Sequence, residues 1–391
     1  MSQQLISRSP DLKKLRDKGY TVEIVDGYLL VNDVPYVNSE CKVMIGTLAS
    51  TLCMANDITT KPEPHTIFFS GEYPCNMNGT EIEQIRHSNS DVSIGDVRLK
   101  QSFSNKPKGG YTDYYEKMTT YIGILENPAK AIDPNVTAQV FRPILVEEND
   151  SVFLYLDTAS SRAGVTEANK KLELNKIAII GVGGTGSYIL DLVAKTPVRE
   201  IHLFDGDEFL QHNAFRAPGA PSGSELQKAT LKVSYFAKIY SKMRRGIVAH
   251  KYAIDESNLE ELNGMDFVFI SIDGGNRKQV IIEKLEEYGI PFVDTGMGVQ
   301  LVDDMLCGIV TLTTSTLTKR DHVRNGRVSF SDTSVDVAYS SNIQIAELNS
   351  LNATLAVIKW KKLFGFYKDY DNEHYCAYTI DGNHMSNEEL V

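Results

Sequence analysis

The sequence predicts an α/β protein with a Rossmann-like, doubly wound and mostly parallel sheet that has helices on both faces, preceded by a smaller α+β domain. Residues 176–195, KIAIIGVGGTGSYILDLVAK, read as a buried strand, a glycine turn and a helix in immediate succession. From residue 176 onward, apolar segments alternate with segments of helical periodicity, as in a parallel sheet with crossover helices. We therefore expect an accessory domain at residues 1–155 and a nucleotide-binding domain at residues 156–391.

The composition is that of a globular protein. Hydrophobic residues make up 42% and charged residues 23% of the 391 positions, and the net charge is −11. Because no dense run of Lys and Arg is present, binding to nucleic acid is not expected. The first twenty residues lack the apolar region of a secretion signal, and no stretch approaches the roughly 18 apolar residues of a membrane span. These features predict a cytoplasmic protein that does not enter a membrane.

The cysteines predict reduced thiols. There are five, with no CxxC pair among them, which argues against a disulfide framework and against a four-cysteine zinc site. The eight histidines show no ligand spacing such as HExxH, so no structural metal is expected. We expect Cys307 and Cys376 to be unreactive and Cys75, in a loop rich in Pro, Asn and Gly, to be exposed.

Residues 1–150 predict a mixed α+β domain whose chemistry cannot be named from residue spacing. A short charged helix is followed by a hairpin that turns at Asp26-Gly27 and by further short strands. Residues 112–132 have apolar side chains at helical spacing, and this helix is expected to end near Pro128. Helix packing is favoured over base stacking for the aromatic cluster Tyr111, Tyr114, Tyr115 and Tyr121.

The second domain is introduced by a strand pair near residues 141–158 and by a polar, partly helical connector. The apolar run at residues 177–180 is too short for a buried helix and ends at glycine, so we read it as the first parallel strand. Further parallel strands are expected at residues 200–209, 250–254, 265–273 and 290–298, with antiparallel strands at residues 299–314 and helices at residues 224–243, 276–289 and 343–367.

The glycine turn is the centre of the candidate site. Gly181, Gly183, Gly184 and Gly186 permit a tight turn and a close backbone approach, and the amides of the following helix point at an anion. Such a pattern is weak evidence by itself, but the strand before it and the helix after it strengthen the prediction. A nucleotide phosphate is the expected ligand.

Polar residues after the second strand help to distinguish ATP from NAD as the expected ligand. Asp205 ends that strand, where a ribose hydroxyl pair would be held in either ATP or NAD. Asp207 follows in the same segment as a further cofactor-binding candidate. Arg216 and Lys228 can hold the β- and γ-phosphates and stabilise departing pyrophosphate, while Asn213 fixes their geometry. Hydride chemistry has no use for these residues, so they favour ATP.

Asp273 follows the fourth strand and is expected at the same edge of the sheet. One carboxylate there can hold Mg²⁺ on a triphosphate, with water completing the coordination. Taken singly, these residues have ordinary structural explanations as turn caps, solvated cations or loop acids. Their joint spacing from one glycine turn favours a nucleotide site.

The motif series GVGGTG, DGDEFLQHNAFR, the QK of SELQKAT and SIDGGNR resembles that of the ThiF/MoeB/ubiquitin-activating superfamily. The resemblance implies an adenylyltransferase that uses ATP and Mg²⁺ to activate the C-terminal carboxylate of a ubiquitin-like or sulfur-carrier-like protein ending in glycine. It assigns Gly183 and Gly184 to the phosphates, Asp205 to the ribose and Asp273 to magnesium. It also implies a homodimer in which an arginine before the first strand completes the partner's ATP site, and Arg162 is the candidate.

Three features depart from the pattern of that family. The zinc cysteine pairs are absent, Asn213-Ala-Phe-Arg216 replaces N-L-x-R, and residues 308–345, where a thioester cysteine is expected, contain no cysteine. We therefore expect the chain to stop at the acyl-adenylate, with a separate thiol protein, or Cys75, accepting the acyl group. The first 150 residues resemble the uncharacterised leading domain of some bacterial ThiF-like proteins.

Two other functions remain open from the sequence. An NAD-dependent oxidoreductase would use the same glycine turn, but it would lack a plausible hydride-site pair. A non-catalytic nucleotide-binding scaffold of the same family would have no need for the complete polar set. Within the family, a carboxylate carried on tRNA or on a short peptide is an alternative substrate.

Overall fold

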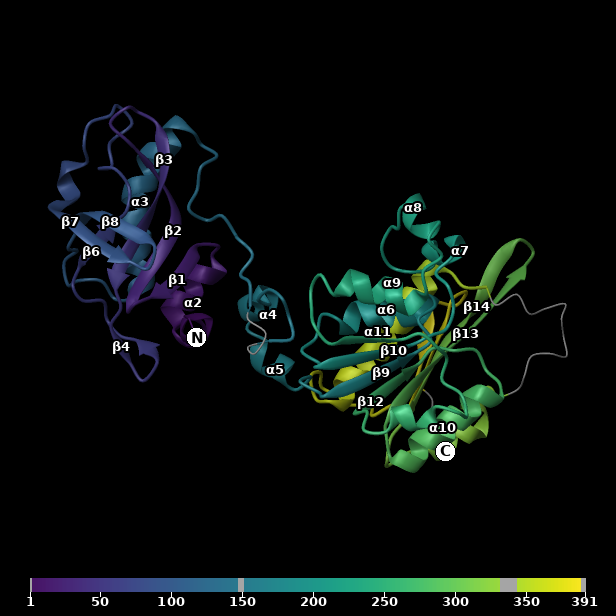
Figure 1. Cartoon of the computed structure of the whole chain (residues 1–391). Helices are drawn as coiled ribbons and strands as arrows, with labels where there is room; N and C mark the ends of the chain where they lie inside the picture. Colours follow the sequence, from purple (N-terminus) through teal and green to yellow (C-terminus); the bar gives the residue numbers. More distant parts are fainter. Residues whose placement is uncertain (1, 147–150, 331–342, 388–391) are drawn as a thin grey trace. The chain divides into compact units, whose positions relative to one another are not determined.

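The chain consists of two compact units, Met1–Ile144 and Leu145–Val391. The computed structural model, drawn in Figure 1, describes residues 2–146, 151–330 and 343–387. Each unit has its own hydrophobic core. The expected strand pair before the second domain forms only isolated bridges, one of which joins Phe153 to Arg244 inside the second unit.

Unit 1 is an antiparallel sheet with helices packed against one face. Its six-stranded sheet has the order β1-β2-β3-β6-β8-β7, and the main core lies between this sheet and the helices α1, α2 and α3. The elements are α1 (Ser2–Arg8), α2 (Pro10–Asp17), β1 (Thr21–Val25), β2 (Tyr28–Val37), β3 (Val43–Thr51), β4 (Met54–Ala55), β5 (Ile58–Thr59), β6 (Thr66–Phe69), η1 (Glu83–Ile85), β7 (Arg86–Ile94), β8 (Val97–Ser104) and α3 (Tyr114–Ile132).

The structure confirms some local predictions for unit 1 and corrects others. The β1–β2 hairpin turns at Asp26-Gly27, where both residues have positive φ angles, as the sequence predicts. Helix α3 continues past Pro128 to Ile132, because a proline so close to the C-terminus removes only one hydrogen bond of the last turns. The β7–β8 hairpin was not predicted, since most of β7 is exposed and its polar sequence has no apolar alternation.

Cys75 is buried in unit 1, which corrects the expectation that its loop exposes it. Its backbone N–H donates to the carbonyl of Val37, so the loop folds back against the end of β2. The side chain packs with Val37 and Ala129, and burial raises the pKa of the thiol. A buried thiol with a raised pKa is a poor acceptor for an acyl group.

Lys117 lies fully buried beneath the sheet of unit 1. Its Nζ donates to Ser50 Oγ at 2.7 Å and to the Pro64 carbonyl at 2.8 Å, and no ion pair involves it within the described residues. Burial lowers the pKa of Lys117 from 10.5 to about 8. Between these two values the unfolded chain binds more protons than the folded one, so this lysine makes unit 1 more stable as the pH rises through that window.

We expect Lys117→Met to remove this pH dependence. From pH 8 to pH 10, the free energy of unfolding of the wild type should gain on the order of 2 kcal/mol relative to the variant. The measurement is urea denaturation followed by circular dichroism, with the fluorescence of Trp360, the single tryptophan and a member of unit 2, marking the other unit. Lys130→Met is the control, at a partly exposed lysine of α3 that is paired with Glu126. Parallel curves for Lys117→Met and wild type would contradict the prediction.

Unit 2 has the predicted doubly wound α/β fold. Its sheet has the order β11-β10-β9-β12-β13-β14-β15-β16, in which the first five strands run parallel and the last three continue as an antiparallel extension. The strands are β9 (Lys176–Ile180), β10 (Glu200–Phe204), β11 (Ile247–His250), β12 (Phe267–Ile270), β13 (Phe292–Val302), β14 (Met305–Ser315), β15 (Tyr375–Thr379) and β16 (His384–Ser386). The helical elements are α4 (Thr158–Ala163), α5 (Thr166–Lys170), α6 (Gly184–Val193), α7 (Gln211–Ala214), α8 (Gly223–Leu226), α9 (Lys232–Tyr240), η2 (Leu259–Leu262), α10 (Asn276–Tyr288), η3 (Val323–Arg327) and α11 (Ala346–Leu363).

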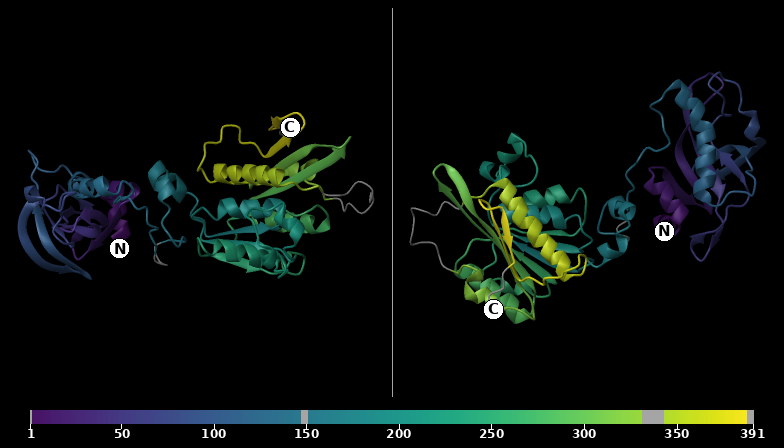
Figure 2. Two further views of the ribbon diagram at one scale, coloured as in Figure 1. Left: turned by 90° about the horizontal axis from the view of Figure 1, so that it is seen from above. Right: turned by 180° about the vertical axis from the view of Figure 1, so that it is seen from behind.

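Both faces of this sheet are covered. Helices α6, α9 and α11 lie on one face and α10 on the other, as Figures 1 and 2 show. Along β9, Ile177 and Ile179 enter the core under α6, whereas Ala178 and Ile180 enter the core under α10. Burial on both faces explains why this strand is a continuous apolar run.

Helix α11 packs against the core of its own unit. It packs along α6, and Ala353, Ala356 and Trp360 are buried in the core on that face of the sheet. The apolar character of residues 343–367 suggests a subunit contact, but the structure uses the apolar side of α11 for this core. The homodimer prediction therefore depends only on the family resemblance.

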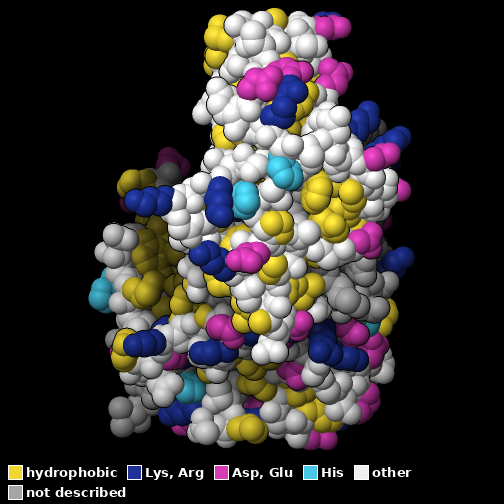
Figure 3. All heavy atoms as spheres, turned by 90° about the vertical axis from the view of Figure 1, so that its left-hand side faces the viewer, with side chains coloured by type: hydrophobic (Ala, Val, Ile, Leu, Met, Phe, Trp, Pro, Cys, Tyr) yellow, Lys and Arg dark blue, Asp and Glu magenta, His cyan; other side chains and the backbone are white. Residues whose placement is uncertain are grey.

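One view of the surface, drawn in Figure 3, shows both signs of charge. On this face, Lys and Arg side chains are interspersed with Asp and Glu side chains. Among the described residues, no helix has both the length and the apolar character needed to span a membrane.

Candidate nucleotide site

A cavity of about 640 Å³ lies in unit 2, where parallel strands of the sheet end. In doubly wound folds, ligands bind at this edge of the sheet. The predicted residues that line it are Gly181, Gly183, Gly184, Asp205, Asp207, Arg216 and Asp273. Seven of the predicted site residues therefore lie together at one cavity.

The glycine turn between β9 and α6 has no room for most side chains. Gly181 has a φ of 84°, and a Cβ there would overlap the carbonyl of Ser271. A Cβ on Gly186 would overlap the carbonyl oxygen of Gly181, so this glycine is required for packing and does not line the cavity. A Cβ on Gly183 would meet no atom within 4 Å, which leaves this position, at the N-cap of α6, open to the cavity. The first amides of α6 are thus accessible to an anion.

Asp205 joins two loops at the floor of the cavity. Its Oδ2 accepts from the amide of Val182 at 2.8 Å, and its Oδ1 accepts from the amide of Asp207 at 2.9 Å. Each carboxylate oxygen can accept a further hydrogen bond, so the residue can brace the glycine turn and still receive a ribose hydroxyl.

Lys232, and not Lys228, brings the lysine charge into the cavity. Lys228 is exposed and lines a separate surface hollow with Glu225 and Tyr235. Lys232 begins α9, is buried, and places its Nζ 2.7 Å from Asp207 Oδ2 and 3.7 Å from Asp205 Oδ1. Its hydrogen bond holds the pKa of Asp207 below the usual value. Position 232 therefore replaces position 228 in the site.

Asn213 caps a short helix and does not reach the cavity. It is buried, its Oδ1 accepts from the amide of Leu210 at 2.8 Å, and it does not line the cavity. This cap fixes the short helix α7, after which Arg216 reaches the cavity. Arg216 Nε is buried without a hydrogen-bond partner, so it can donate to a ligand.

Beyond β12, the cavity is lined by the predicted Asp273 and by two residues that were not predicted, Lys278 and Asp294. Asp273 lines the cavity just beyond β12, and behind it Lys278 Nζ lies 2.7 Å from Asp294 Oδ1 in a buried ion pair. Burial raises the pKa of the Asp294 carboxyl. In the described residues, no three His, Cys, Asp or Glu side chains are placed to hold a metal together. A magnesium ion here would fit only as a companion of bound phosphates, with Asp273 as a protein ligand.

Helix α11 places two asparagines in the cavity. Asn349 accepts from Thr185 Oγ1 at 3.0 Å and donates to the carbonyl of Arg216 at 3.2 Å, which links the glycine turn to the arginine loop. Asn352 donates to the carbonyl of Gly296 at 2.9 Å. Four lining residues have buried polar atoms without a hydrogen-bond partner: Arg216 Nε, Arg327 Nε, Gln344 Oε1 and Asn352 Oδ1. Because buried polar atoms are normally satisfied, this concentration indicates a polar ligand.

Arg162 and the cysteines of unit 2 lie elsewhere. Arg162 is exposed on α4 and does not line the cavity. Cys376 is buried in the core, where burial raises the pKa of its thiol. Cys307 is half-buried on β14, although its apolar surroundings in the sequence predict a buried thiol. The segment where a thioester cysteine was sought includes residues 331–342, which lie outside the described residues.

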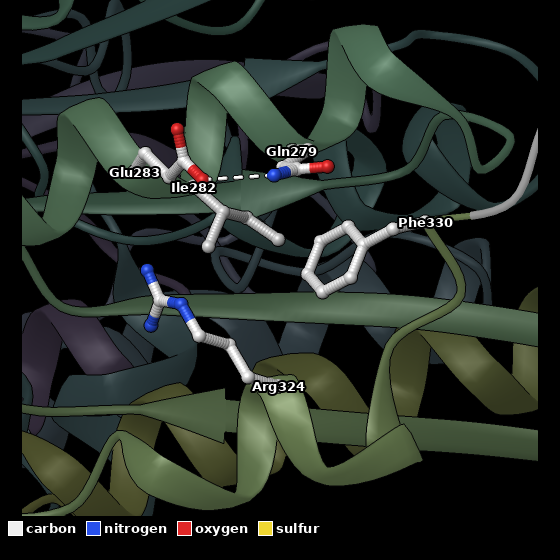
Figure 4. A pocket seen from close by; sticks show the side chains of 5 residues that line it. All are labelled: Gln279, Ile282, Glu283, Arg324 and Phe330. Atoms are coloured by element: carbon white, nitrogen blue, oxygen red, sulfur yellow. Dashed lines mark hydrogen bonds between the residues drawn. The ribbon is translucent and has the colours of Figure 1, made fainter.

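A second hollow, of about 100 Å³, lies on the α10 side of unit 2. Figure 4 shows its lining, where Gln279 donates to Glu283 at 2.9 Å and Arg324 projects from η3. Arg324 is paired with Glu286 at 2.6 Å. The hollow has room for only a few water molecules, so it is too small for a nucleotide.

Comparisons with known proteins match each part of the chain. Residues 10–158 match a domain of unknown function, DUF6791, and residues 157–318 match the ThiF family. A curated relative, the tRNA threonylcarbamoyladenosine dehydratase of Haemophilus influenzae, is 26% identical over 127 residues, which are 32% of this chain and 49% of that protein. The chain thus matches about half the length of this relative.

Solved structures similar to this chain have low identity. The microcin C7 biosynthetic enzyme MccB in complex with N-formylated MccA is 16% identical, with 56% of this chain and 66% of that chain covered and a TM-score of 0.43. PaaA is 15% identical, with 71% and 93% covered and a TM-score of 0.48. E. coli MccB has also been solved with ATP, and that structure gives 17% identity, 56% and 65% coverage and a TM-score of 0.41. The match over residues 157–318 shows that unit 2 contains a ThiF family domain.

Proposed function

We propose that this chain is an ATP-dependent adenylyltransferase that activates a carboxylate as an acyl-adenylate, with residues 156–391 as the adenylation domain and residues 1–155 as an accessory domain. The observation that carries the proposal is one cavity that joins the open amides of α6, the cations Arg216 and Lys232, and the carboxylate of Asp273 after β12. These are the groups that a triphosphate and its magnesium need. The ThiF family match supports the same activity.

The reaction follows from the charges in the cavity. An oxygen of the substrate carboxylate attacks the α-phosphorus of ATP, and the bond to the bridging oxygen breaks and releases pyrophosphate. No general base is required, because the carboxylate is already ionised. Arg216 and Lys232 would stabilise the charge that develops on the leaving pyrophosphate, and Asp273 would hold the magnesium on the phosphates. The preferred substrate is a ubiquitin-like or sulfur-carrier-like protein that ends in glycine, and a free peptide is the closest alternative.

Pyrophosphate exchange tests this proposal. The wild-type chain should incorporate labelled pyrophosphate into ATP only when magnesium and a carboxylate substrate ending in glycine are present. Asp273→Asn should lower this exchange by about a hundredfold and leave the fold intact. Binding of NAD in preference to ATP would instead favour the oxidoreductase. ATP binding without any exchange would favour the non-catalytic scaffold.

We also propose that Arg162 completes the ATP site of a second copy in a homodimer. An exposed arginine outside the cavity of its own chain is compatible with this role. After subunit exchange, a mixture of Arg162→Ala and Asp273→Asn proteins should recover activity at about a quarter of the sites, as random pairing predicts. Sedimentation must show dimers and exchange must be verified separately. A mixture without recovery would remove the proposed role in the partner's site.

A further inference from the structure

The cavity extends beyond the nucleotide residues, along the hairpin of β13 and β14. Gly296 and Gly298 lie two positions apart on β13, so they share one face of the strand, and their partners on β14 are Thr311 and Ile309. All four residues line the cavity. A Cβ on Gly296 would overlap Thr311 Oγ1, so this part of the floor is bare backbone on the β13 side. Because β13 contributes no side chain at these two positions and Thr311 and Ile309 occupy the β14 side, the remaining space fits a chain that is narrow and unbranched.

Arg327, which has no carboxylate partner among the described residues, borders this floor. The guanidinium of Arg327 lies over the ring of Tyr375, with its Cζ 3.8 Å from the ring centroid, and both residues line the cavity. Its Nε is buried without a hydrogen-bond partner, and the described residues form no ion pair with it. The carbonyl of Arg327 accepts from Thr313 Oγ1 at 3.0 Å, and Thr313 pairs with Tyr375 across the β14–β15 ladder. The strands therefore fix both the backbone of Arg327 and the ring beneath it.

A stacked guanidinium keeps its N–H donors at the edge of the plane, where they match the two oxygens of a carboxylate. Asn352 adds a buried Oδ1 without a partner next to the same floor, because its amide nitrogen donates to the Gly296 carbonyl. Arg216 and Lys232 come from the β10 side of the cavity, so Arg327 is a further cation on a different side of it. A negatively charged substrate that must approach a triphosphate needs such a cation to offset the repulsion between the two anions.

We propose that Arg327, stacked on Tyr375, binds the carboxylate of the acyl substrate, and that the glycine floor of β13 accepts a C-terminal residue without a branched side chain. This inference rests on the proposed adenylation. It assigns Arg327 to recognition of the carboxylate, separate from the residues that hold ATP. It also predicts that an uncharged C-terminus is rejected.

The test uses the full-length protein saturated with magnesium and the ATP analogue AMPCPP. Binding of the peptide acetyl-Ala-Gly-Gly with a free carboxylate is compared with binding of the same peptide as its carboxamide. We expect the wild type to bind the acid at least roughly tenfold more tightly than the amide, and Arg327→Gln to lose this preference. Tyr375→Phe should keep the preference because the stacking surface remains, whereas Tyr375→Ala should lose part of it.

Arg324→Gln is the matched control. Arg324 lies three positions earlier in η3, is paired with Glu286 and projects into the small hollow of Figure 4. Its replacement should leave the preference for the acid unchanged. All variants should bind AMPCPP as the wild type does, which shows that the fold and the nucleotide site are intact.

Three results would overturn the inference: wild-type protein that does not bind the acid, equal binding of acid and amide, or an unchanged preference in Arg327→Gln. Each of them, with AMPCPP binding and pyrophosphate exchange preserved, would remove Arg327 as the carboxylate ligand and leave the adenylation proposal in place. Wild-type protein that does not bind AMPCPP would contradict the proposed function itself, and with it the inference.

Discussion

Lys232→Ala is expected to lower the rate of pyrophosphate exchange by about a hundredfold or more, whereas Lys228→Ala should leave it within about twofold of wild type. Lys232 is buried against the cavity and lies within 4 Å of Asp205 and Asp207. Its loss removes a cation from the phosphates and also leaves two carboxylates uncompensated where a triphosphate must bind. Lys228 is an exposed lysine four residues earlier, outside the cavity, so it controls for the loss of one positive charge nearby.

The KM for ATP and the value of kcat separate the two effects of this lysine. Repulsion from unpaired Asp205 and Asp207 should raise KM, and loss of charge stabilisation in the transition state should lower kcat. In the double variant Lys232→Ala/Asp207→Asn, KM should partly recover while kcat stays low. Trp360 fluorescence checks that unit 2 is folded in each variant. Equal exchange rates in Lys228→Ala and Lys232→Ala would show that neither lysine holds the phosphates.

The strands and helices around the glycine turn were predictable because their signals are local. The 177–180 run is apolar on both faces of the sheet, and glycines must stand where a Cβ has no room, as at Gly181 and Gly186. No comparable local signal tells which residue of a loop reaches the cavity. Lys228 lies in the turn after α8, whereas Lys232 begins α9, and the non-helical segment between the two helices determines which lysine reaches the cavity.

Some residue types can serve either a structural or a ligand-binding role, and their position in the fold determines which role they have. An asparagine can cap a helix or bind a ligand, and Asn213 is a buried cap. Helix α11 was predicted as an apolar closing helix, but Asn349 and Asn352 are three positions apart and so occupy the same face. Because asparagine is a poor helix former and costly to bury, this pair was a signal of function that could have been read from the sequence.

Gly186→Ala is expected to unfold unit 2 or lower its melting temperature by about 10 °C or more, whereas Gly183→Ala should leave the melting temperature within about 3 °C of wild type. A Cβ at position 186 would overlap the carbonyl oxygen of Gly181, so α6 would have to move away from β9 and open the core on that face. At position 183 the φ is −77° and no atom lies within 4 Å of the added methyl group. Both variants add one methyl group to the same turn, so their difference isolates the close backbone contact.

The two glycine variants also separate stability from ligand binding. In Gly183→Ala the new methyl group stands at the N-terminus of α6, where a phosphate would approach, so this folded variant should bind ATP at least about tenfold more weakly than wild type. Thermal unfolding followed by Trp360 fluorescence reports unit 2, and calorimetric titration with ATP reports the site. Wild-type melting of Gly186→Ala would contradict the packing argument. A stable Gly183→Ala protein with wild-type ATP affinity would show that the phosphates do not reach the first amides of α6, and the nucleotide would then have to be held mainly by Arg216 and Lys232.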